Sequence, residues 1–321
     1  MPGSSHPPLE PYESGLPEVG DGQTLYWETV GRADGVPAVW VHGGPGSGSS
    51  KRARRYFDPA AYRAVLFDQR GCGRSRPLVS DPASDLASNT TDSLIDDLER
   101  LREHLGIERW VVVGVSWGVT LALAYAQRHP DRVLAMVLGA VTTGSRRELE
   151  WLTRDMGRLF PQAWEQFVAL VPEQEQASDL AAAYARLLGH PDPQTREEAA
   201  RASCTWEDTH VSLAPDWRPD PRYDDATFRL VFARLVTHYW SHGCFLTDRQ
   251  LLAGMPRLAS IPGVLIHGRH DISSPPDTAW QLHRAWPGSR LVLLESGHGG
   301  HGFPEEFPAA LDIFGQSRLS R

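Results

Sequence analysis

The sequence predicts an α/β fold: a mostly parallel central sheet with helices on both faces and an inserted helical cap. Short β-branched runs alternate with helical patterns over residues 21–144 and again over 253–321, which is typical of a parallel sheet covered on both faces. Residues 145–252 differ, because they hold helical patterns and several prolines but no clear buried strand. We therefore expect 21–144 and 253–321 to form one α/β core and 145–252 to form the cap.

Residues 1–20 contain many prolines, glycines and serines, which indicates a flexible N-terminal arm. The first part of the predicted core follows this arm. Residues 90–105 carry apolar side chains at helical spacing and stop before Gly106, which predicts a helix. Three strands are expected before that helix. They cover residues 23–30, where apolar and polar residues alternate, and the short apolar runs 38–41 and 64–67.

The rest of the core repeats the same alternation on both sides of the cap. A β-branched run at 111–113 predicts a strand, residues 119–126 predict the helix after it, and residues 132–138 predict the next strand. Beyond the cap, the expected elements are strands at 263–267 and 290–294, a helix at 278–285 between them, and a closing helix at 307–314.

The composition is that of an ordinary globular protein, with 41% hydrophobic and 22% charged residues. A net charge of -8 and the lack of a Lys/Arg-rich block argue against nucleic-acid binding, and no apolar run approaches the ~20 residues of a membrane span. The N-terminal stretch has no features of a secretory signal, and the three cysteines lack metal-like spacing. We expect a cytoplasmic protein without metal or cofactor. The sequence does not predict the oligomeric state.

The stretch Gly114–Gly118, GVSWG, lies between a predicted strand and a predicted helix. Strand, tight turn and helix are the context in which G-x-S-x-G forms a nucleophile elbow. Side chains at the two glycines would collide with neighbouring elements, and the turn lifts the Ser116 hydroxyl above the sheet edge, at the positive end of the helix. An incidental serine in such a turn is the alternative, and the flanking patterns favour the nucleophile.

The glycine-rich stretch His42–Gly46 follows the predicted strand at 38–41. It matches no phosphate-binding pattern, which argues against a nucleotide site. Acyl transfer places negative charge on a carbonyl oxygen, and free backbone N–H groups must meet that charge. The sequence therefore predicts an oxyanion hole built from Gly43, Gly44 and the N–H of Trp117, the residue after the nucleophile.

A nucleophilic serine needs a base within hydrogen-bond distance, and that base needs an orienting acid. In the α/β-hydrolase fold these groups follow the serine in the order acid, then histidine. Asp271 and His298 directly follow the last two predicted strands, so we expect both at the sheet edge that carries Ser116. His301 and, more weakly, His270 are rival bases. The sequence thus predicts an α/β-hydrolase fold with the triad Ser116, Asp271 and His298.

These motifs resemble the proline iminopeptidases, serine aminopeptidases of the α/β-hydrolase fold that remove an N-terminal proline. The resemblance spans residues 20–315 and is carried by HGGPG at 42–46, DQRGCGRS at 68–75, GVSWG at 114–118, YAQRHPDRV at 125–133 and GRHD at 268–271. It implies that Glu207, in the cap step Trp206-Glu207, binds the substrate's free amine, and it places Trp206 at the substrate as well.

Two positions depart from the family pattern. Val236 stands where the family has a second acidic residue for the amine, and Thr142 lies in a stretch where the family places an aromatic residue near the proline ring. The predicted activity is therefore cleavage of an N-terminal residue, proline or similar, from small peptides or amides. The alternatives are an esterase or amidase that needs no free amine and a ligand-binding protein without catalysis; an epoxide hydrolase or dehalogenase would need aspartate in place of Ser116.

Overall fold

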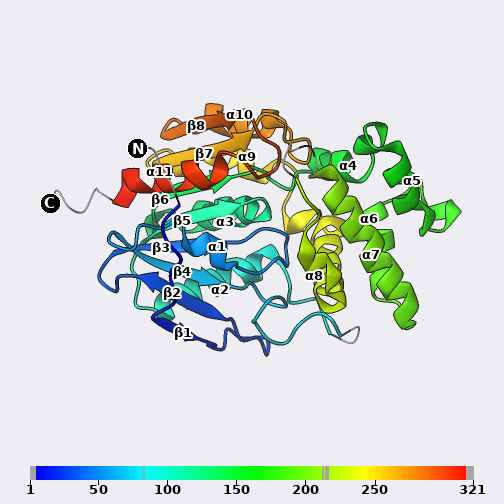
Figure 1. The fold of residues 1–321 in the computed structure, drawn as a ribbon, viewed down its shortest axis with the longest axis horizontal. Coiled ribbons are helices and arrows are strands. Elements are labelled where there is room, and N and C mark those ends of the chain that lie inside the picture. The colour runs from blue at the N-terminus through cyan, green and yellow to red at the C-terminus, as the bar shows by residue number, and fades with distance from the viewer. Residues whose placement is uncertain (1–4, 82–83, 212, 214–216, 316–321) are drawn as a thin grey trace.

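The computed structural model describes residues 5–81, 84–211, 213 and 217–315, and within them it forms an eight-stranded sheet with helices on both faces and a further group of helices beside one end (Figure 1). The strand order is β1-β2-β4-β3-β5-β6-β7-β8. The first two pairings, β1 with β2 and β2 with β4, are antiparallel, and all the others are parallel. The strands are β1 (Glu13–Gly15), β2 (Trp27–Gly31), β3 (Val36–Val41), β4 (Tyr62–Phe67), β5 (Trp110–Val115), β6 (Val133–Gly139), β7 (Gly263–Gly268) and β8 (Ser289–Leu294).

The central strands are apolar throughout because both faces of the sheet are covered. In β5, Trp110 and Val112 pack into one core cluster, and Val111 and Val113 pack into the cluster on the opposite face, as expected for side chains that alternate along a strand. The first face is covered by α2 (Thr91–His104), α3 (Trp117–Arg128), α9 (Gln250–Ala253) and α10 (Pro276–Ala285), and the second by α1 (Lys51–Arg54) and α11 (Phe303–Gly315).

A second group of helices lies between β6 and β7 in the chain and gathers at one end of the sheet (Figure 1). It consists of α4 (Arg146–Thr153), α5 (Pro161–Ala169), α6 (Leu180–Leu188), α7 (Pro193–His210) and α8 (Ala226–Ser241). The helices α6, α7 and α8 each begin after an aspartate that accepts hydrogen bonds from first-turn N–H groups, namely Asp179, Asp192 and Asp225. No strand occurs among the described residues between β6 and β7, as the sequence predicts.

These inserted helices have an apolar core of their own. The Phe167 ring stacks on Tyr184 with ring centroids 4.3 Å apart and on Trp206 at 5.5 Å. All three side chains are buried. These stacked rings therefore hold the inserted helices together.

The N-terminal arm is more ordered than the sequence predicts. Residues 13–15 form β1 and pair with residues 27–29, and the Val19 side chain is 1% exposed. The tripeptide Glu-Ser-Gly has little strand propensity, so this edge strand exists only because β2 offers its free edge. Among the described residues, no helix is long and apolar enough to cross a membrane.

Candidate active site

Ser116 lies at the turn between β5 and α3 in a conformation that few residues adopt. Its φ is 54° and its ψ is -125°, and such a backbone costs on the order of 1–3 kcal/mol. A Cβ at Gly114 would lie 2.5 Å from the carbonyl oxygen of Gly118, and a Cβ at Gly118 would lie 2.1 Å from that of Val41. The tight turn therefore requires both glycines.

The structure brings Ser116 together with His298 and Asp271, which come from the loops after β8 and β7. His298 Nε2 lies 2.9 Å from Ser116 Oγ, and His298 Nδ1 lies 2.9 Å from Asp271 Oδ2. The other Asp271 oxygen accepts a hydrogen bond from the backbone N–H of Ser274 at 2.9 Å. An ionised carboxylate only accepts, so Nδ1–H donates to Asp271, and Nε2 is left to accept the Ser116 hydroxyl proton.

The electrostatics of this row of groups favour an ionised acid beside a basic ring. Burial raises the pKa of Asp271, but the His298 and His267 rings outweigh burial and hold that pKa below its ordinary value. Burial lowers the pKa of His298, but the Asp271 carboxylate, aided by Glu207, raises it above the ordinary value. The imidazole is therefore a stronger base than a free histidine.

The two rival histidines lie elsewhere. His270 is exposed, and its Nε2 lies 3.4 Å from Glu295 at the surface. His301 is also exposed. Neither ring has a hydrogen bond to Ser116 among the described residues, whereas the His298 ring has one.

The glycine-rich loop after β3 lies against Ser116. A Cβ at Gly43 would come within 3.1 Å of the Ser116 Cβ. His42 Nε2 accepts a hydrogen bond from the backbone N–H of Gln69 at 3.0 Å, so Nδ1–H donates to the Gly43 carbonyl at 2.9 Å. Because this carbonyl and the Gly44 N–H belong to one planar peptide group, holding the oxygen also fixes the direction of the N–H.

Trp117, the first residue of α3, is also held in place by hydrogen bonds. Its indole Nε1–H donates to the Gln69 side chain at 3.0 Å, and the Gln69 amide nitrogen donates to the His42 carbonyl at 2.9 Å. The backbone N–H of a first helical residue has no carbonyl one turn earlier in its own helix. Gln69 therefore ties together the two segments predicted to form the oxyanion hole.

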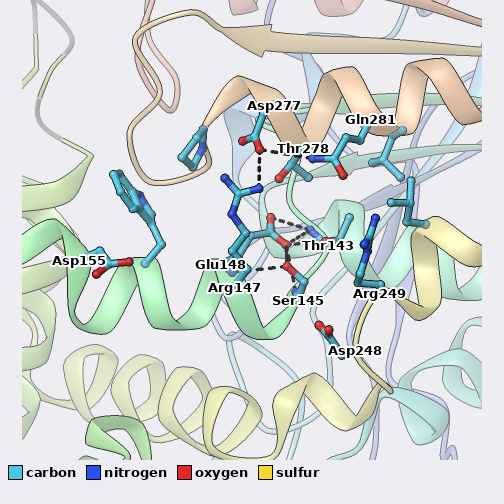
Figure 2. A pocket seen from close by; sticks show the side chains of 14 residues that line it. Thr143, Ser145, Arg147, Glu148, Asp155, Asp248, Arg249, Asp277, Thr278 and Gln281 are labelled. Atoms are coloured by element: carbon cyan, nitrogen blue, oxygen red, sulfur yellow. Dashed lines mark hydrogen bonds and ion pairs between the residues drawn. The ribbon is translucent and has the colours of Figure 1, made fainter. Parts of the chain in front are cut away.

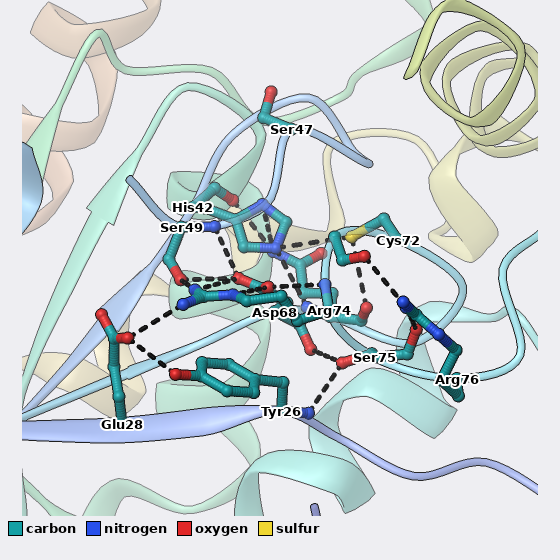
Figure 3. A network of polar contacts seen from close by, with 12 residues as sticks. Tyr26, Glu28, His42, Ser47, Ser49, Asp68, Cys72, Arg74, Ser75 and Arg76 are labelled. Carbon is teal, nitrogen blue, oxygen red and sulfur yellow. Dashed lines mark hydrogen bonds and ion pairs between the residues drawn. The ribbon is translucent and has the colours of Figure 1, made fainter. Parts of the chain in front are cut away.

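Beneath this loop lies a network of charged groups (Figure 3). The Asp68 carboxylate accepts from the backbone N–H and hydroxyl of Ser49 at 2.7 and 2.6 Å and from the backbone N–H and Nε of Arg74, both at 2.8 Å. Arg74 also donates to Glu28 at 2.9 Å, and the Tyr26 hydroxyl donates to the same Glu28 oxygen at 3.0 Å. Burial raises the pKa of Asp68, but its donors outweigh burial and keep it below the ordinary value.

Two cavities of very different size meet at Ser116. The smaller has a volume of about 40 Å³, which is room for a small ring or a few waters. The larger has a volume of about 700 Å³ and opens on the other side, between the loops after β3 and β8 and the helices α7 and α8. Gly44, Ser116, Glu207 and His298 line both cavities.

The structure brings Glu207 to this junction but turns Trp206 away from it. Adjacent residues on a helix point about 100° apart, and on α7 this turn separates the Trp206 indole from the Glu207 carboxylate. The Trp206 side chain is 2% exposed, and its Nε1–H donates to the Leu152 carbonyl at 3.0 Å among the inserted helices. The expectation that Trp206 contacts the substrate is therefore corrected, since this indole packs in the core of the inserted helices.

The two positions that depart from the family pattern have different surroundings. Val236 is 2% exposed and packs with Cys204 and Phe232 between α7 and α8. Thr142 lines the smaller cavity, and its carbonyl accepts a hydrogen bond from Thr120 at 3.0 Å. The wall of the smaller cavity is thus polar at Thr142.

Glu148 is a residue of the site that the sequence analysis did not single out. It is 5% exposed and accepts hydrogen bonds from Thr142, Thr143 and Ser145. It lies between the smaller cavity and a surface groove of about 490 Å³, and its carboxylate points at Thr143 and Ser145 (Figure 2). It also forms the capping box of α4 with Ser145, and S-x-x-E at 145–148 is the sequence signal that could have revealed it.

Two buried histidines were also missed. His267, at the end of β7, accepts a hydrogen bond from the Val141 N–H at 2.9 Å and lies 2.7 Å from the Ser274 carbonyl, so it holds the loop that carries Asp271. His210, the last residue of α7, lines the smaller cavity beside Glu207. No sequence motif marks either residue, because Val141 and Ser273, which hold the two rings, are distant from them in the chain.

Comparisons with known proteins concern the fold and the family of the whole chain. The family model described as the alpha/beta hydrolase fold matches residues 37–305. A probable proline iminopeptidase of Streptomyces coelicolor is 50% identical over 97% of this chain and 98% of its own length, and a proline iminopeptidase of Xanthomonas citri is 45% identical over 91% and 93%. The crystal structure of a proline iminopeptidase from Mycobacterium smegmatis has a TM-score of 0.64 at 22% identity, covers 95% of this chain and 98% of its own, and shares the fold.

Proposed function

The chain belongs to the α/β-hydrolase fold family and, within it, to the proline iminopeptidases, and from this premise we propose that Ser116, His298 and Asp271 cleave an N-terminal proline or similar residue from small peptides. It is a serine hydrolase of that family. The observation that carries the residue assignment is the hydrogen-bonded row from Asp271 through His298 to Ser116, which ends at the junction of the two cavities.

In the proposed reaction, Ser116 Oγ attacks the carbonyl carbon of the N-terminal residue while His298 Nε2 takes the hydroxyl proton. His298 then gives that proton to the leaving nitrogen, and the C–N bond breaks to release the shortened peptide. A water molecule, deprotonated by the same ring, hydrolyses the acyl-enzyme and frees the N-terminal residue. Asp271 holds the ring in the required tautomer and stabilises its charged form.

The oxyanion of each tetrahedral intermediate is assigned to the backbone N–H groups of Gly44 and Trp117, with Gly43 allowing close approach. The hydrogen bond from His42 to Gly43 and the contacts of Gln69 support this assignment, because they fix these donors before the substrate arrives. Donors that need no reorganisation as charge develops are the most effective ones.

The unequal cavities support removal of one small residue from a longer chain. The smaller cavity suits a proline-sized acyl group, and the larger suits the rest of the peptide. In the same proposal, residues 145–252 act as a cap that closes the smaller cavity over the substrate. The three cysteines are buried and unpaired, which fits a reducing cytoplasm.

The free-amine requirement is tested by Glu207→Gln, which keeps the side-chain shape and removes its charge. Burial raises the pKa of Glu207, but the neighbouring His210 and His298 rings outweigh burial, and the net pKa is lowered, so the carboxylate is ionised at neutral pH. Losing a hydrogen bond between charged groups should cost about 1.5–3 kcal/mol, a loss of roughly 10- to 150-fold in kcat/KM for a prolyl arylamide at pH 8.

The matched control substrate is the N-acetylprolyl arylamide, which has no ammonium group. Its kcat/KM should be nearly the same in Glu207→Gln as in wild type. The measurement is kcat/KM for both substrates with wild type and Glu207→Gln. An equal loss on both would assign Glu207 a structural role. The activity would then be that of an esterase or amidase without need for a free amine.

The acid limb of the pH–rate profile should lie above the ordinary histidine pKa of 6.5. Catalysis requires neutral His298, and Asp271 and Glu207 raise its pKa, so kcat/KM should begin to fall at a higher pH than for an unperturbed ring. With the N-acetylated substrate, Glu207→Gln should move this limb to lower pH, because one negative charge near the ring is removed. Glu150→Gln, at an exposed carboxylate of α4, is the control. An unchanged limb in Glu207→Gln would contradict the prediction.

A further inference from the structure

His210 is a buried polar residue that takes no part in the proposed catalytic triad. Its side chain is 2% exposed, and it lines the smaller cavity with Glu207, Ser116 and His298. Glu207 and His210 are three residues apart on α7 and therefore lie on one face of the helix. The ring is thus part of the wall that a bound substrate would touch.

The hydrogen bonds of Ser273 fix which nitrogen of this ring carries the proton. Ser273 Oγ lies 2.9 Å from the His210 carbonyl oxygen and 2.8 Å from His210 Nδ1. A hydroxyl has one proton, and a carbonyl oxygen can only accept, so Ser273 donates to the carbonyl and accepts from Nδ1–H. In the neutral ring, the lone pair is therefore on Nε2.

This Nε2 atom is buried and has no aligned hydrogen bond among the described residues. It lies 3.0 Å from Glu207 Oε2. When the ring is protonated, Nε2–H faces Glu207 and contributes to the lowered pKa of that carboxyl. When the ring is neutral, as a basic pH favours, Nε2 and the ionised carboxylate are two acceptors side by side, which repel each other unless a donor reaches both. The Glu207 side chain is 22% exposed and has room to turn and admit a donor, whereas Ser273 pins His210.

The other charged groups of the smaller cavity do not supply that donor. Glu148 is an acceptor that is already occupied by Thr142, Thr143 and Ser145. His298 is engaged with Asp271 and Ser116. Among the described residues that line this cavity there is no lysine or arginine. The pair of acceptors therefore suits a cationic donor that comes from outside the protein.

We propose that Glu207 and His210 together bind the substrate's ammonium group, Glu207 Oε2 accepting one N–H and His210 Nε2 accepting the other. The proposal rests on the proposed function, since it concerns the amine of the same substrate. The secondary ammonium of an N-terminal proline has two N–H bonds, and the two acceptors match them. His210 is in this way a specificity-determining residue, and Ser273 positions it through the tautomer.

Two substitutions separate this role from a structural one. His210→Asn keeps a polar atom near the Nδ1 position for Ser273 but has nothing at the Nε2 position. His210→Gln places its amide oxygen near the Nε2 position. We expect His210→Asn to raise KM for the prolyl arylamide by about tenfold with kcat little changed, because the contact is equal in ground and transition states. His210→Gln should retain most of the wild-type KM.

The N-acetylprolyl arylamide should respond to neither substitution by more than about twofold, because it brings no ammonium. Equal losses on both substrates in His210→Asn would overturn the proposal and make His210 a structural residue. A higher kcat/KM for the prolyl arylamide in His210→Asn than in wild type would also overturn the proposal, since it would mean that His210 competes with the substrate ammonium for Glu207.

A third substrate tests the proposal in the wild-type protein without any substitution. The N-methylprolyl arylamide keeps the positive charge and the ring but has only one N–H. In wild type, kcat/KM for this substrate should be about tenfold lower than for the prolyl arylamide, whereas in His210→Asn the two values should be similar. The added bulk of the methyl group affects both proteins equally, so comparing the two ratios isolates the contact between His210 and the second N–H. Equal discrimination by both proteins would overturn the proposal.

The outcomes also separate this inference from the proposed function. If Glu207→Gln impairs only free-amine substrates while His210→Asn impairs neither, the amine is bound by Glu207 alone and only the inference on His210 fails. If neither variant distinguishes the prolyl from the N-acetylprolyl arylamide, amine recognition at this site fails as a whole.

Discussion

Replacing Ser116 with alanine should lower kcat by ~10³-fold or more and leave the fold intact. The hydroxyl oxygen is the proposed nucleophile, and its loss removes the covalent step, while the oxyanion donors still give some residual catalysis. The folded state should change little, because alanine at this position keeps the same positive φ of 54° and the same strain. The measurement is kcat on a prolyl arylamide, with the thermal midpoint recorded in parallel.

A fluorophosphonate probe gives an independent readout of the same residue. Wild type should be labelled once, at Ser116, and the Ser116→Ala protein should not be labelled. Ser47→Ala is the control, because Ser47 also lines the larger cavity but has no hydrogen bond to His298 among the described residues. Labelling that persists in Ser116→Ala would reject the assignment of the nucleophile.

Replacing His298 with alanine should lower kcat by a similar ~10³-fold or more, whereas replacing His301 should leave much of the activity. His298 Nε2 is 2.9 Å from the Ser116 hydroxyl, and without this base the serine stays protonated at neutral pH. The His301 ring is exposed three residues further on. The matched pair changes the same residue type in the same loop, so general damage to that loop would affect both variants.

The decisive measurement for the base is the ranking of kcat for the two variants on the N-acetylprolyl arylamide, which leaves amine binding out of the comparison. Circular dichroism and thermal unfolding establish that both are folded. A severe loss in His301→Ala with activity kept in His298→Ala would reject the assigned base. Comparable severe losses in both would mean that the loop, and not one ring, limits catalysis.

Local sequence patterns were sufficient to predict those features of this protein that depend on neighbouring residues. The elbow is local: a β-branched strand, two glycines that leave no space for a Cβ, and a helix follow one another within residues 110–128. Asp271 and His298 were predicted for a similar reason, since each lies in the loop after a strand, and the carboxyl ends of parallel strands meet at one edge of the sheet. The helical character of the segment between β6 and β7 was predicted from its helical patterns, its prolines and the lack of a buried-strand pattern.

Which side chains of the inserted helices face the smaller cavity depends on how those helices pack. The pair Trp206-Glu207 appears as one motif in the sequence, but the helix turns the indole into the cap core and the carboxylate into the smaller cavity. The proposed role of His210 depends on Ser273, which is 63 residues away, and the ordered conformation of residues 13–15 depends on the pairing of β1 with β2. Such contacts are set by packing between distant segments, whereas the local pattern of a sequence specifies only the element in which each residue lies.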